Sequence, residues 1–136
     1  MRRFWMLLGL LAVTAVLTTG CVPGDPAALA EAKLLKVDSL ELMGKAVEPF
    51  TDHETEVEAL TTRLKAALAD NAAKCCNETL TDQWRILLDT ETNQLGAFIE
   101  RWETKGILGA TFIEEAKWVV DKSFDQIINV EEERCK

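Results

Sequence analysis

The chain has 136 residues, 48% of them hydrophobic and 28% charged, which suits a single domain. Its formal net charge of −8 makes nucleic acid and anionic lipid poor partners for the body of the domain. Tyrosine is absent, and proline and glycine are few, so the composition predicts an all-α protein.

The start of the chain has the three parts of a secretory signal. Two arginines precede the apolar run Phe4–Leu17, and small residues then lead to Cys21. The run is shorter than the roughly 20 residues that a transmembrane helix needs. We therefore expect residues 1–20 to be a signal peptide.

The exit of this segment, Thr18-Thr19-Gly20-Cys21, resembles the lipobox of bacterial lipoproteins, with Thr18 where that family usually has Leu. The resemblance covers the leader alone. It implies a lipidated Cys21 as the mature N-terminus, followed by a short linker to residue 26. It also implies that Val22, in place of Asp, directs the protein to the periplasmic face of the outer membrane in a cell with two membranes. The alternatives are an uncleaved anchor, or a cleaved signal with Cys21 an ordinary thiol.

Four amphipathic segments follow in residues 27–136. Asp25-Pro26 is typical of an N-cap with proline at the first helical position, and threonine caps precede the other three segments. Gly106 is a natural helix C-cap. The predicted helices run from Pro26 to about Glu48, from Thr51 to about Cys75, from Thr79 to about Lys105 and from Thr111 to about Arg134.

Each predicted helix has one apolar stripe, and the connections are short. Neighbouring helices should then be antiparallel, which favours an up-down-up-down four-helix bundle. The alternative is a three-helix core with the first helix splayed off or swapped into a dimer. Leu34, Val37 and Trp118 fall outside the stripes, so they are candidate partner contacts. The predicted core includes Leu87, Leu95, Phe98, Val120, Phe124 and Ile127.

No pattern in the chain indicates catalysis. The single histidine, His53, begins the second helix and Cys75 ends it, about 33 Å away at 1.5 Å per residue, which disfavours a Cys–His nucleophile. Glu-x-x-His pairs, phosphate loops and zinc spacings are missing, so we predict no enzyme, cofactor or metal site. Glu91, in the third stripe, is either a buried functional acid or a solvent-reachable part of the stripe.

The remaining cysteines should meet at one end of the bundle. In an up-down-up-down topology, the second connection and the C-terminus share that end, and export permits disulfides. We therefore predict a bond from Cys135 to Cys75 or Cys76, with a vicinal bond or free thiols as the alternatives. Cys75 and Cys76, with Cys135 as a third ligand, could instead bind a soft metal such as Cu(I).

These observations favour a non-enzymatic cell-envelope lipoprotein, a small bundle that binds another protein or acts as a scaffold or modulator at the membrane. The short tether after Cys21 would keep the domain near partners in the envelope. The alternative function is a periplasmic ligand sensor or a thiol-based soft-metal sensor.

Overall fold

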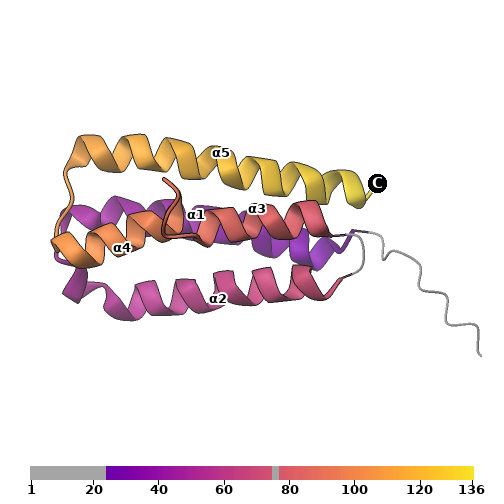
Figure 1. Cartoon of the computed structure of the whole chain (residues 1–136), viewed down its shortest axis with the longest axis horizontal. Coiled ribbons are helices and arrows are strands. Elements are labelled where there is room, and N and C mark those ends of the chain that lie inside the picture. The colour runs from indigo at the N-terminus through magenta and orange to yellow at the C-terminus, as the bar shows by residue number, and fades with distance from the viewer. Residues whose placement is uncertain (1–23, 75–76) are drawn as a thin grey trace, which may run out of the picture.

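A computed structural model describes residues 24–74 and 77–136, and in these ranges the protein is an all-α helical bundle, as predicted (Figure 1). The leader, Cys21, Cys75 and Cys76 lie outside the described residues. The α-helices are α1 (Pro26–Gly44), α2 (Glu54–Ala73), α3 (Glu78–Leu88), α4 (Leu95–Lys105) and α5 (Ala110–Arg134). Two 3-10 helices, η1 (Lys45–Val47) and η2 (Phe50–Asp52), join α1 to α2.

The long helices lie side by side. Helix α1 packs against both α2 and α5, and α3 packs against the same two helices. Figure 1 shows α3 and α4 following one another along one side of the bundle. Gly24 contacts the end of α5, and we call this end of the bundle the tether end. The α4–α5 connection lies at the opposite end, which we call the distal end.

The start of α1 forms as predicted. Asp25 is extended, and its Oδ1 accepts a hydrogen bond of 2.9 Å from the Ala27 N–H, with Pro26 at the first helical position. Gly106 ends α4 with a φ of 80°, the left-handed conformation that glycine adopts without strain.

The predicted threonine caps are wrong, because tertiary contacts place the helix starts elsewhere. Thr51 lies inside η2, where the neighbouring Phe50 N–H donates to Gly106 O at 2.8 Å, and α2 begins only at Glu54. Leu108 is buried and its N–H donates to Ala46 O at 2.8 Å, so α5 starts at Ala110, before Thr111.

The second threonine cap and the predicted end of α2 also differ from the structure. Helix α3 starts at Glu78, before Thr79, with Asn77 in the N-cap position. Helix α2 ends at Ala73, short of Cys75.

The predicted helix from Thr79 to Lys105 is also wrong, because it is two helices separated by a polar loop, residues 89–94. Thr92 Oγ1 donates to Ile86 O at 2.9 Å, and the Glu91 N–H donates to Asp89 Oδ1 at 2.8 Å. These local bonds compete with the helical pattern. Helix α4 then restarts against α3, with Gly96 in close contact with Leu88 O.

The predicted core is confirmed. All six residues named from the sequence are less than 4% exposed. Trp84 meets Phe124 edge to face at 6.0 Å, and Trp102 meets Phe50 in the same geometry at 5.3 Å near the distal end. Val47, in η1, is 49% exposed because α1 ends at Gly44 and the chain turns.

Candidate functional site

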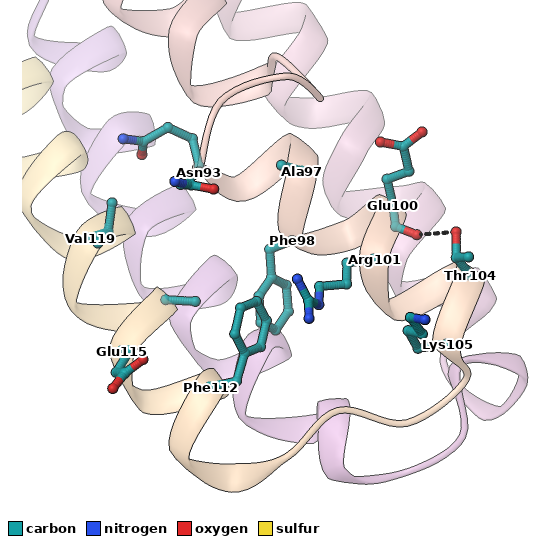
Figure 2. A pocket seen from close by; sticks show the side chains of 12 residues that line it. Asn93, Ala97, Phe98, Glu100, Arg101, Thr104, Lys105, Phe112, Glu115 and Val119 are labelled. Atoms are coloured by element: carbon teal, nitrogen blue, oxygen red, sulfur yellow. Dashed lines mark hydrogen bonds between the residues drawn. The ribbon is translucent and has the colours of Figure 1, made fainter.

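An open groove with a volume of about 670 Å³ lies between α4 and α5 toward the distal end (Figure 2). Its size falls in the usual range for binding sites. It lies beside the loop 89–94, which contributes Asn93 and Gln94 to its lining, and the helical pattern of the sequence did not predict this loop. We call it the α4–α5 groove; its lining includes Asn93, Gln94, Ala97, Phe98, Glu100, Arg101, Thr104, Lys105, Phe112, Glu115, Ala116 and Val119.

Two stacked aromatic rings and a guanidinium form the centre of this groove. The Phe98 and Phe112 rings are 6.0 Å apart and almost parallel, at 1°. The Arg101 guanidinium lies over the Phe112 ring, 4.5 Å from its centroid, in a cation–π contact (Figure 2). A partner side chain could therefore bury apolar surface on Phe112 beside a fixed positive charge.

Charged and polar side chains surround this centre. Glu100 and Lys105 come from α4, and Glu115 comes from α5. Thr104 Oγ1 donates to the Glu100 carbonyl at 2.8 Å, as Figure 2 shows. An apolar floor with a mixed charged rim is typical of a protein-binding surface.

The three partner-contact candidates from the sequence are exposed, as expected. Trp118 is 66% exposed, Val37 61% and Leu34 55%. The structure does not bring them together in one site. Trp118 is on α5, one helical turn after Glu115 of the groove, whereas Leu34 and Val37 are on α1, which contributes no residue to the groove lining.

His53 has partners that suit a packing role at the start of α2. Its Nε2 is 2.5 Å from Glu48 Oε2, and its ring is 5.6 Å from Trp102. Both contacts are near the distal end, whereas Cys135 follows α5 at the tether end. The structure does not bring His53 and Cys135 together.

Glu91 is exposed in the loop 89–94, so the reading of a buried acid in the third stripe is wrong. Among the described residues, the buried acid is Glu131 on α5, which is 3% exposed, and burial raises the pKa of its carboxyl. Its position, a helical turn after Ile127 on the buried face of α5, was the signal available in the sequence.

The tether end joins the start of the domain to its last turn. The Gly24 N–H donates to Arg134 O at 2.8 Å. Lys74 Nζ lies 2.6 Å from Asp70 and 3.4 Å from Asp25. Burial lowers the pKa of Lys74, but hydrogen bonds to Asp70 and Asp25 outweigh that effect and raise it. Cys135 is exposed with a free thiol, and both of its predicted partners lie outside the described residues, so the pairing stays a prediction.

Residues 24–74 and 77–136 contain no cluster of three or more His, Cys, Asp or Glu side chains able to hold a metal ion. In the same ranges, no helix has the length and apolar character that crossing a bilayer requires. The soft-metal alternative at Cys75 and Cys76 falls outside these residues.

No protein-family model, curated protein or solved structure matches the chain.

Proposed function

We propose that the protein is a non-enzymatic, lipid-anchored module of the cell envelope that binds a protein partner through the α4–α5 groove. The observation that carries the proposal is the groove itself, whose stacked phenylalanines and Arg101 offer an apolar floor beside a fixed charge. The occupant is a segment of the partner that presents an apolar side chain to Phe112. A salt-bridging acidic residue in that segment would pair with Arg101 or Lys105.

The proposed anchor and the groove lie at different ends of the domain. Gly24, three residues after Cys21, lies at the tether end, and the groove lies toward the distal end. Lipidation of Cys21 after removal of residues 1–20 would hold the tether end at the bilayer and leave the groove accessible. In a cell with two membranes, the location is the periplasmic face of the outer membrane.

We also propose that α3 and α4 act as one leg of an up-down-up-down four-helix bundle. The packing of α1 and of α3 against both α2 and α5 supports this arrangement. So does the close contact of Gly96 with Leu88, which restarts α4 where α3 ends.

Site-specific photo-crosslinking in living cells tests the partner site. A benzophenone amino acid is placed at Thr104 in the groove and, as a matched control, at Thr62 on α2. Both threonines are exposed and helical, and each donates to the carbonyl four residues earlier, at 2.8 and 2.9 Å. We expect a defined protein adduct from position 104, lost in Phe112→Ala, and no adduct from position 62. Equal adducts from both positions, or none from position 104, would contradict the proposal.

A further inference from the structure

A second cavity lies at the tether end, between the first turns of α1 and the last turns of α2. Its volume is about 310 Å³, near the lower limit for small-molecule sites. Small side chains on both helices leave this space open, and the lining includes Ala27, Ala28, Ala32, Ala66 and Ala67. Trp84 of α3 and Glu131 of α5 also line it, and both are buried.

One of these buried side chains, Trp84, has an unmatched polar group, and the other, Glu131, has an ionisable one. Trp84 is 2% exposed, and its Nε1–H has no acceptor among the described residues. Glu131 is 3% exposed, and the positive charges of Lys74 and Arg134 are close enough to oppose the effect of burial on its pKa. Buried polar groups are nearly always paired. By contrast, Asn71 in the same lining donates to Ala67 O at 2.9 Å and accepts from Asn77 at 3.1 Å.

Two cations near the cavity, Arg63 and Lys74, form ion pairs with carboxylates other than Glu131. Arg63 lies 2.9 Å from Glu31 and 2.6 Å from Asp38. Lys74 lies between Asp70 and Asp25. The lining contains four carboxylates, Asp25, Glu31, Asp70 and Glu131, and one cation, Arg63, and this excess of negative charge favours a positively charged occupant.

We infer that this cavity binds a small organic cation that also carries an oxygen acceptor. Its ammonium group would pair with the Glu131 carboxylate, its oxygen would accept from Trp84 Nε1–H, and its apolar body would cover the indole ring and the alanines. A hydrogen bond between charged groups, such as that between the ammonium group and Glu131, is stronger than one between neutral groups. This site is separate from the α4–α5 groove and does not depend on the proposed function.

The test uses three probes of similar size and the indole N–H signals of the full chain in maltoside detergent and phosphate buffer. The probes are 2-amino-1-phenylethanol, its uncharged analogue 1-phenyl-1,2-ethanediol, and mandelate. Trp84→Phe assigns the Trp84 signal by its loss. We expect the amine to shift this signal and to bind at least about tenfold more tightly than the diol, since one charge pair is worth that much. Mandelate should not bind.

Two variants test separately the charge of Glu131 and the open volume of the cavity. Glu131→Gln keeps the shape and removes the charge, so the amine should bind no better than the diol. Ala67→Leu fills the cavity and should abolish binding of both. Glu115→Gln, in the α4–α5 groove, is the control and should bind like the wild type. The Trp102 signal, far from the cavity, reports whether each variant is folded.

An unmoved Trp84 signal would overturn the inference. Equal binding of amine and diol to the wild type would overturn it as well. So would a preference for the amine that survives in a folded Glu131→Gln, or amine binding that survives Ala67→Leu.

Discussion

Gly24 and Arg134 join the two ends of the described domain. The Gly24 N–H donates to Arg134 O at 2.8 Å, so a residue of the proposed linker contacts the last turn of α5 directly. A Cβ at Gly24 would lie 2.5 Å from both Arg134 C and Cys135 N, which are backbone atoms and cannot move independently of the helix. The contact requires glycine at this position.

Gly24→Ala should therefore destabilise the protein by about 1–3 kcal/mol, the usual cost of forcing an extra carbon into a packed site. Gly109→Ala is the matched control, because nothing lies within 4 Å of a Cβ there. Urea denaturation of both variants measures the difference. Equal free energies of unfolding would mean that Gly24 is not held against α5.

Phe124 is at the centre of the core. It is fully buried and meets Trp84 edge to face at 6.0 Å. Phe124→Ala should lower the free energy of unfolding by about 3–5 kcal/mol, because it removes a large buried ring and leaves a cavity. Trp118→Ala, at a side chain that is 66% exposed, should change it by less than about 0.5 kcal/mol. A cost below about 1 kcal/mol for Phe124→Ala would mean that the buried face of α5 is misassigned.

Glu131 gives stability a pH dependence of known sign. Burial raises its pKa, and the positive charges of Lys74 and Arg134 only partly oppose this, while Asp25 and Asp70 add to it. The folded state therefore holds this proton at pH values where the unfolded chain has lost it. The protonated form of Glu131 therefore contributes stability at low pH. This contribution is lost as the pH rises from the ordinary glutamate pKa, near 4.5 in the unfolded chain, through the raised pKa of the folded state.

Glu131→Gln should remove this pH-dependent loss of stability, because glutamine does not ionise. The difference in the free energy of unfolding between variant and wild type, measured by urea denaturation across that range, should change in favour of the variant as the pH rises and then level off. Glu115→Gln, at an exposed position, should show no such trend relative to the wild type. A difference for Glu131→Gln that is constant with pH would contradict a raised pKa.

The pattern of apolar residues predicted most of the fold. The stripes that contain Leu87, Phe98 and Phe124 are buried as expected, because helical spacing places such residues on one face and burial of that face drives packing. The Asp25 cap formed because it depends only on its own turn. Local pattern and tertiary packing agree at these positions.

The helix boundaries depend on tertiary contacts that the apolar pattern does not contain. Leu108 and Phe50 each form a backbone hydrogen bond to a distant segment, and these bonds set where α5 and α2 begin. The polar loop 89–94 is inserted into a leg whose apolar stripe continues on both sides, so periodicity alone did not reveal it. Its Asp, Thr and Asn content was the available signal.

The α4–α5 groove and the cavity at the tether end could not be predicted from the apolar stripes. The groove depends on how α4 restarts after the loop, and the cavity at the tether end depends on alanines of two helices meeting. Exposure of Leu34, Val37 and Trp118 was predictable, because they lie off the apolar faces.

The disulfide at the tether end remains a prediction. Lys74 and Asn77, on either side of Cys75 and Cys76, contact Asp25 and Asn71 at the tether end, where Cys135 also lies. Oxidation after export should link Cys135 to Cys75 or Cys76, closing a loop worth roughly 4 kcal/mol in the chain-entropy estimate. Peptide mapping of the native protein without reductant checks this. If peptides with Cys135 never appear linked to the Cys75-Cys76 peptide, the thiols are not paired in this way.

The anchor at Cys21 is the central claim, since location at the membrane depends on it. Mass spectrometry of the protein purified from its native membrane measures it most directly. We predict a mature chain that begins at Cys21 and carries a diacylglycerol thioether and an acylated amine, and a Cys21→Ser variant that lacks both. An unmodified Cys21, or a wild-type chain that retains residues 1–20, would contradict the account.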